Sequence, residues 1–141
     1  MRTKYYLNQI RDLDVKLNNK LAERETLWTL ATKVTPTLSF ESRAGGVNDK
    51  VGNIVAKIVE LDEEIHKQID EFITLKAEII KQIEKVKNGK YHDLLYKRYV
   101  QYKDFSTIAC EMGYEYMTIL NMHGKALLEF EKVMIKNDIK L

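Results

Sequence analysis

Residues 105–114 read FSTIACEMGY, and this stretch decides the fold of the C-terminal part of the chain. Its spacing is typical of a helix-turn-helix, because an apolar residue and Ala109 lie inside a short helix and Gly113 follows four residues after the alanine. The small Ala109 side chain lets the next helix approach closely, and Gly113 can adopt the backbone conformation of a tight turn. We therefore predict a short helix, a turn and a second helix here.

The segments on either side of this stretch complete a three-helix module. Their apolar spacing predicts helices over about residues 91–101, 104–112 and 115–135. The residues expected to face the shared core are Leu94, Leu95, Tyr99, Ile108, Ile119, Met122 and Ala126. Cys110 follows Ala109 and is expected to be buried or half-buried as a small apolar residue.

Two long amphipathic patterns precede the module. Apolar residues recur at three- and four-residue steps over residues 6–34, which predicts one long helix with Arg24 as its one polar interruption. Pro36 disfavours helical geometry in the residue before it, so we expect this helix to stop there and residues 37–47 to form a loop.

The second pattern is a heptad-like apolar stripe between Asp49 and Val86. We expect Asn48 or Asp49 to cap the start of this helix, and Gly89 to end it in the left-handed conformation. Neither long helix is stable alone. The two helices should therefore fold back as an antiparallel hairpin, with leftover apolar surface pairing with a second copy of the chain.

Together these patterns predict an all-α fold, in which a long antiparallel helical hairpin (coiled coil) is followed by a three-helix helix-turn-helix module. The boundary is placed at residues 88–90, so that residues 1–88 assemble the protein as a homodimer and residues 89–141 form the module. The chain has only six glycines and one proline, too few to punctuate a sheet protein with many turns.

Composition narrows the class of protein. With 45% hydrophobic and 31% charged residues, the chain is expected to be a soluble globular or coiled-coil protein. No apolar run is long enough for a membrane span or a signal peptide, so we expect no membrane partner and a cytoplasmic location. The single cysteine excludes an intramolecular disulfide, and a net charge of +2 is too small to indicate a nucleic-acid partner by itself.

The module resembles region 4 of bacterial sigma factors, through residues 91–100, 105–114 and 118–127. The whole chain, including residues 33–39, is similar to small phage and prophage proteins of Gram-positive bacteria near the RinA and ArpU type regulators of late transcription. The resemblance implies a transcription regulator that binds promoter double-stranded DNA, RNA polymerase or both in the cytoplasm of the bacterial host.

The candidate DNA contacts come from the last helix and from the basic residues before it. The side chains expected to face outward and read bases are Tyr116, Met117, Leu120 and Asn121, of which Asn121 could pair with adenine. Phosphate contacts are expected from Lys97, Arg98 and Lys103, near Lys90, and from Lys125 on the last helix.

An alternative is an interaction protein that does not bind DNA. The last helix carries Glu115, Glu129 and Glu131, whose charges would repel phosphate, and Glu115 stands where region-4-like modules commonly have serine or threonine. Met117 and Leu128, together with Leu120, could form an apolar surface for RNA polymerase or another phage or host protein.

No residue pattern predicts catalysis, a metal site or a cofactor. Glu63 and His66 have the spacing of one half of a di-iron site, but no second copy exists, so a solvated face is expected. His92 and His123 lack a nucleophile in a fitting pattern, and His123 could instead contact phosphate. Trp28 is expected to be a core anchor.

Overall fold

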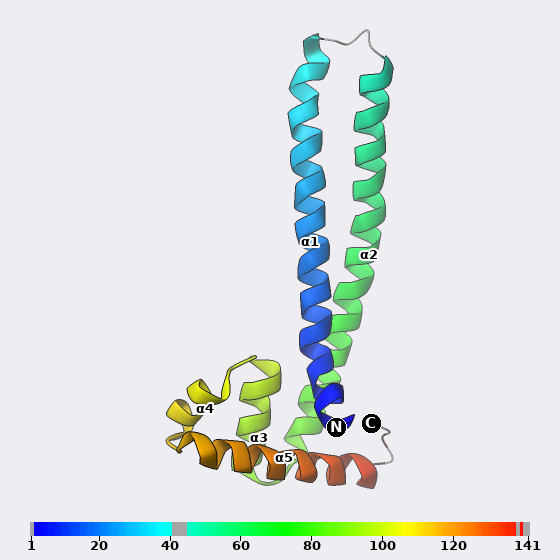
Figure 1. The fold of residues 1–141 in the computed structure, drawn as a ribbon. Coiled ribbons are helices and arrows are strands. Elements are labelled where there is room, and N and C mark those ends of the chain that lie inside the picture. The colour runs from blue at the N-terminus through cyan, green and yellow to red at the C-terminus, as the bar shows by residue number, and fades with distance from the viewer. Residues whose placement is uncertain (1, 41–44, 138, 140–141) are drawn as a thin grey trace. The chain divides into compact units, whose positions relative to one another are not determined.

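The computed structural model describes residues 2–40, 45–137 and 139, with side chains described at residues 2–33, 49–137 and 139. Every regular element in this part of the chain is a helix, which confirms the all-α prediction (Figure 1). The elements are α1 (Arg2–Phe40), α2 (Gly45–Glu84), α3 (Gly89–Leu95), the π-helical turn η1 (Tyr96–Val100), α4 (Phe105–Met112) and α5 (Tyr116–Lys136).

The contacts between residues group the chain into two compact units. We call Met1–Leu13 together with Phe72–Leu141 the head unit, and Asp14–Glu71 the hairpin unit. Leu7 and Ile10 of α1 are fully buried in the same core as residues of α3, α4 and α5, which is why the start of the chain belongs to the head unit. The contacts therefore divide the chain within both long helices, after Leu13 and after Glu71.

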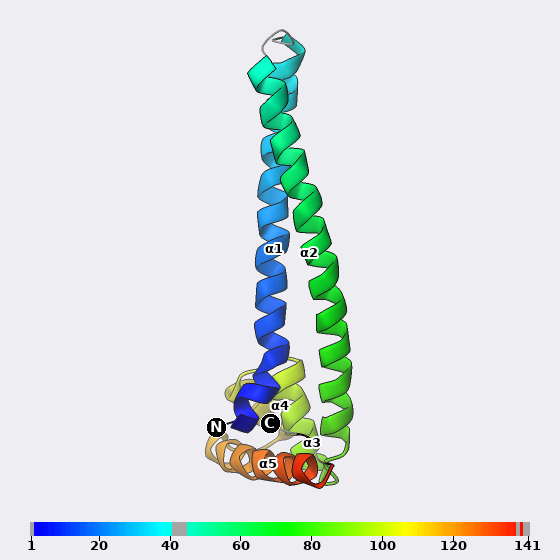
Figure 2. The same ribbon diagram turned by 90° about the vertical axis from the view of Figure 1, so that its right-hand side faces the viewer.

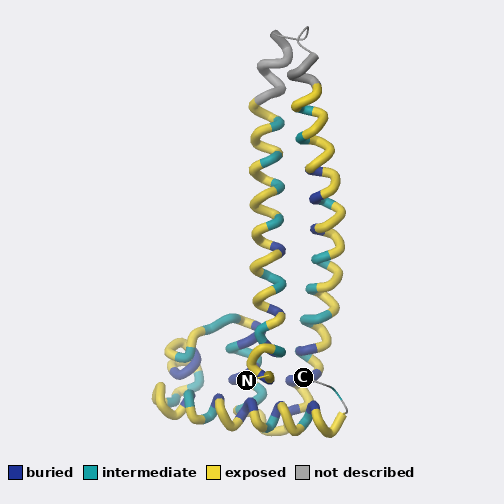
Figure 3. The backbone as a smooth tube through the Cα atoms, turned by 45° about the vertical axis from the view of Figure 1, so that its right-hand side comes forward, coloured by how far each residue is buried: buried dark blue, intermediate teal, exposed yellow. Residues whose placement is uncertain are grey.

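In the hairpin unit, α1 and α2 run antiparallel and side by side, as predicted (Figure 2). A narrow apolar seam of Leu17, Leu61 and Ile65 holds them together, with Leu27 and Ile69 packed against it. Arg24, the interruption in the apolar pattern, pairs across the hairpin with Asp62, and Lys20 pairs with Glu64 at 3.2 Å. Figure 3 shows this seam as a few buried positions spaced along mostly exposed helices.

The helix boundaries at the far end of the hairpin unit differ from the prediction. α1 continues through Pro36, and most of the loop expected over residues 37–47 is helical; residues 41–44 lie outside the described residues. The proline ring fixes φ near the helical value, so a helix can include proline, although it loses one hydrogen bond and the ring crowds the carbonyl four residues earlier. Asn48 and Asp49, the expected caps, lie inside α2.

The segment after α2 also differs from the prediction. α2 ends at Glu84, and Gly113 is the one glycine with positive φ among the described residues, so Gly89 is not a left-handed cap. Asn88 instead caps the start of α3, because its side-chain oxygen accepts hydrogen bonds from the amides of Lys90 at 3.0 Å and Tyr91 at 3.5 Å. Asparagine is among the residues most favoured at the start of a helix, and here it starts one.

The head unit has one continuous core to which every one of its helical segments contributes. Its fully buried side chains include Leu7, Ile10, Ile79, Ile83, Leu94, Leu95, Ile108, Ile119, Phe130 and Met134. The predicted core residues of the three-helix module are confirmed, with Met122 partly buried at the edge. Gln82 of α2 is buried among them and accepts a hydrogen bond from the Tyr6 hydroxyl at 2.6 Å.

Two predicted burials are wrong. Trp28 is 55% exposed, with the Arg24 guanidinium 6.0 Å from its ring centre, so it does not anchor the core of the hairpin unit. Cys110 is exposed on α4. Both residues lie on helices that bury only one narrow face. Apolar residues beside that face, whether large like Trp28 or small like Cys110, stay in solvent.

We predict opposite effects on stability for the Gly113→Ala and Gly124→Ala variants. Gly113 has φ of 74°, so an added Cβ there should lower the free energy of unfolding by about 1–2 kcal/mol. Gly124 lies within α5, and a Cβ built on it meets no atom within 4 Å, so alanine should raise stability by about 0.5–1 kcal/mol. Urea unfolding measures both changes, and a stabilised Gly113→Ala variant would contradict the left-handed turn.

Candidate nucleic-acid interface

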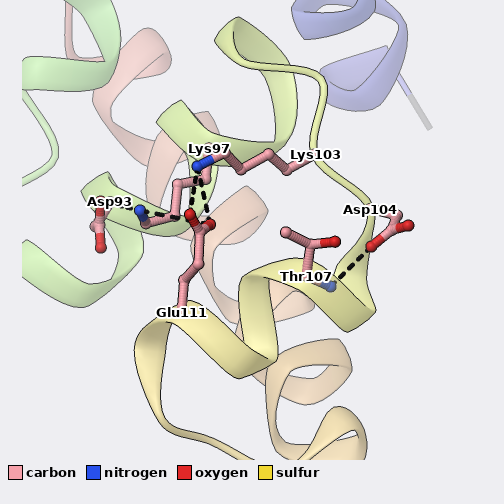
Figure 4. A network of polar contacts seen from close by, with 6 residues as sticks. All are labelled: Asp93, Lys97, Lys103, Asp104, Thr107 and Glu111. Carbon is pink, nitrogen blue, oxygen red and sulfur yellow. Dashed lines mark hydrogen bonds and ion pairs between the residues drawn. The ribbon is translucent and has the colours of Figure 1, made fainter.

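α4 and α5 form the helix-turn-helix-like part of the head unit, and local hydrogen bonds define both ends of α4. The Asp104 carboxylate accepts a hydrogen bond from the Thr107 amide at 2.7 Å, which caps the start of α4 (Figure 4). This bond holds the pKa of Asp104 below its ordinary value. Gly113 in the left-handed conformation then ends the helix, and the Tyr114 amide donates to the Ala109 carbonyl at 3.0 Å.

The candidate base-reading side chains lie on α5, immediately after this turn. Tyr116 is 48% exposed and Met117 is 63% exposed, while Asn121 is exposed and Leu120 is half-buried. Because Ile119 is fully buried, α5 packs against the core on one side and presents these positions on its other faces. Their role as base contacts stays a prediction.

Two of the predicted phosphate contacts are already paired with a carboxylate. Lys103 Nζ lies 2.5 and 2.9 Å from the two carboxylate oxygens of Glu111, and Lys97 Nζ lies 3.8 Å from the same group (Figure 4). Lys97 also lies 3.9 Å from Asp93. The two lysines lower the pKa of Glu111, with the Lys103 hydrogen bond as the largest cause, so this carboxylate stays charged and neutralises part of the basic cluster.

The backbone between η1 and α4 places Lys103 opposite Glu111. Tyr102 has φ of 60°, an uncommon conformation for a residue other than glycine, and it turns the chain out of η1. The Lys103 amide donates to the Lys97 carbonyl at 3.0 Å, which closes this turn. Lys97 and Lys103 are thereby brought to one carboxylate although they belong to different segments.

Arg98 and Lys125 are placed differently from these two lysines. The Arg98 guanidinium lies 4.2 Å from the Phe105 ring centre and donates to the Lys103 carbonyl at 3.1 Å, so this half-buried side chain joins η1 to α4. Lys125 is exposed on α5 and lines a groove together with Lys90 and Asn121. Of the four predicted phosphate contacts, Lys125 is the one placed beside a predicted base contact.

The structure gives His123 a different role from the one the sequence suggested. It is 7% exposed, so the suggested phosphate contact is wrong, and its Nε2 lies 2.7 Å from the Tyr99 hydroxyl oxygen. Burial lowers the pKa of His123 to about 4 and raises the pKa of Tyr99 to about 12, so both side chains are neutral at pH 7. The Phe105 ring meets the imidazole edge-on at 4.8 Å. The sequence does contain a signal for this burial: His123 lies four residues after Ile119 and three before Ala126, which places it on the apolar face of α5.

The remaining candidates carry no chemistry in the described part of the chain. His66 Nδ1 lies 2.7 Å from the carbonyl oxygen of Asp62, in the preceding turn of its own helix. Among the described residues, no three His, Cys, Asp or Glu side chains gather as a metal site would require. None of the helices that were described is long and apolar enough to cross a membrane.

The buried His123 predicts a loss of stability at mildly acid pH. The unfolded chain takes up a proton near the ordinary histidine pKa of 6.5, whereas the folded chain resists protonation until about pH 4. As the pH falls from about 7 to 5, the unfolded state therefore gains protons first, and the free energy of unfolding should fall by about 1–2 kcal/mol. Urea unfolding at several pH values measures this loss. His123→Gln should remove most of it, and the matched variant His66→Gln, which changes an exposed imidazole, should retain it; an unchanged slope in His123→Gln would contradict the assignment.

Comparisons with known proteins place the chain without naming an activity. A family model described as a protein of unknown function (DUF1492) matches residues 33–131, which is more than half of the chain. No curated protein matches the chain, and no solved structure matches it either. The matched residues include all of α2 and the whole turn between α4 and α5. The chain belongs to this family of proteins of unknown function, DUF1492.

Proposed function

We propose that this protein is a transcription regulator of the phage type, which binds double-stranded DNA through α4 and α5 and is assembled as a dimer by its hairpin unit. The resemblance of residues 91–127 to sigma-factor region 4 supports a target at promoters, with RNA polymerase as a further partner, in the cytoplasm of the bacterial host. The proposed role is binding and not catalysis.

One observation carries this proposal. The capped helix α4 ends in a tight left-handed turn, and the exposed start of α5 follows that turn. Gly113 ends α4 in the left-handed conformation next to α5, and the Asp104 cap holds the opposite end of α4. Helix-turn-helix proteins place the first residues of such a second helix against base edges in the major groove. Asn121 and Lys125, exposed on successive turns of α5, supply an amide for adenine and a cation for a nearby phosphate.

We predict that Asn121→Ala reduces sequence preference without unfolding the protein. Fluorescence anisotropy with fragments of phage genomic DNA and with random duplex gives the ratio of the two affinities. Because a bidentate amide–adenine pair contributes about 1–3 kcal/mol, this ratio should fall about tenfold or more, while binding to random duplex stays the same.

Asn19→Ala is the matched control, because Asn19 is exposed on α1 in the hairpin unit. It should leave both affinities unchanged, and circular dichroism should show that both variants retain their helices. Wild-type preference in Asn121→Ala would remove Asn121 from the base-reading residues.

The second candidate function is the interaction protein that does not bind DNA, and two observations favour it. Lys97 and Lys103 are paired with Glu111, which weakens the basic cluster that was expected to hold phosphate. Met117 and Leu128 are 63% and 54% exposed, so α5 also offers apolar side chains to a protein. Binding of the folded wild-type protein to RNA polymerase, with no DNA binding at about 50 mM salt, would favour this function over the first.

The hairpin unit supports the dimer part of the proposal. Two helices bury only a narrow seam, and large apolar side chains remain exposed along both: Val15, Leu21, Trp28, Leu30, Val55 and Val59. Burial of apolar surface against a second copy is favourable by about 25 cal/mol per Å². Pairing two hairpins as a four-helix bundle would cover these side chains.

We predict that Val59→Lys weakens self-association. Val59 is 54% exposed on α2, and a lysine there would place a charge in the shared apolar surface. Sedimentation equilibrium should show a dimer for the wild type at micromolar concentration and a monomer for Val59→Lys. Asn53→Lys adds the same charge at another exposed position on α2 and should remain dimeric. A monomeric wild type would contradict the dimer.

A further inference from the structure

Six lysines of the head unit face two neighbouring grooves beside α5. Lys85, Lys87, Lys132 and Lys136 line the first groove, and Lys90 and Lys125 line the second. Asn88 lines both grooves, so the two are adjacent at the segment between α2 and α3. We call these six residues the lysine stripe.

The α5 members of the stripe lie on one face of the helix. Lys125, Lys132 and Lys136 are separated by steps of seven and four residues, which return to the same side of an α-helix. Asn121 lies one further turn toward the start of α5 and lines the second groove. The stripe is therefore continuous with the candidate base-reading positions.

The stripe has a local excess of positive charge that the chain as a whole does not have. The chain has 23 basic and 21 acidic residues, whereas the two grooves are lined by six lysines and one acidic residue, Glu129. Glu129 pairs with Lys132 at 3.4 Å, but the two side chains are 45% and 73% exposed, so solvent weakens this pair. Lys90 lies 5.5 Å from the Tyr114 ring centre, and within the described residues no ion pair engages Lys85, Lys87, Lys125 or Lys136.

From these observations we infer that the lysine stripe binds the sugar-phosphate backbone of duplex DNA while the start of α5 faces the bases. Lys125 to Lys136 extends about 17 Å along α5, so its lysines can contact more than one phosphate of a strand. Phosphates repeat along a duplex, and a row of exposed ammonium groups suits a repeating anion better than a single small one. This inference rests on the proposed DNA-binding function, and it moves most of the phosphate contacts away from Lys97 and Lys103.

The test removes three charges of the stripe by the substitutions Lys85→Gln, Lys132→Gln and Lys136→Gln, all at exposed positions. Full-length protein is titrated into preferred and random duplex between about 50 and 200 mM salt. Loss of three phosphate contacts should lower affinity for both duplexes at least tenfold and reduce the slope of log K against log salt by about 2–3. The arginine variant at the same three positions keeps the charges and should bind like the wild type.

Two further variants separate the possible results. Lys16→Gln, Lys50→Gln and Lys67→Gln remove the same charge from exposed positions of the hairpin unit and should have a much smaller effect. If the stripe variant keeps the wild-type slope while Lys97→Gln with Lys103→Gln loses it, the inference is overturned and DNA binding stands. If the folded wild type binds neither duplex, the proposed function fails and the inference fails with it.

Discussion

The hydrogen bond between the Tyr99 hydroxyl and His123 Nε2 is the interaction on which the candidate interface depends. It joins η1 to α5 at 2.7 Å inside the head unit, where either group would be costly to leave without a partner. Phe105 of α4 packs edge-on against the same imidazole. The Arg98 guanidinium lies over the Phe105 ring. This polar pair and the Phe105 ring therefore hold η1, α4 and α5 together inside the head unit.

Charge is distributed unevenly around this buried pair. Glu111 neutralises part of the cluster formed by Lys97 and Lys103, whereas the lysine stripe has a single acidic neighbour in its two grooves. A net charge of +2 conceals this difference, because it sums 23 basic and 21 acidic residues over the whole chain. Local arrangement, and not composition, is what favours a phosphate partner.

Features set by local signals could be predicted from the sequence. The Gly113 turn depends on the conformational preference of one residue, and it was found where expected. Pro36 and Gly89 were misassigned, because proline is compatible with helical φ and because Asn88, just before Gly89, caps the start of α3.

Long-range contacts could not be predicted in the same way. The burial of Leu7 and Ile10 in one core with α3, α4 and α5 depends on how distant segments pack, which no periodicity encodes. The lysine stripe has the same origin, since Lys85 and Lys87 lie far from Lys132 and Lys136 in sequence and meet only at one groove. A single chain also contains no signal for the partner that would cover the exposed side of α5.

Amide hydrogen exchange with and without duplex DNA tests the central claim most directly, because it reports which surface is covered. We predict slower exchange on adding DNA at the start of α5 and in the segment joining α2 to α3, with little change in the part of α4 that carries Glu111. Protection confined to α4 and η1, or no protection anywhere in the head unit, would contradict it.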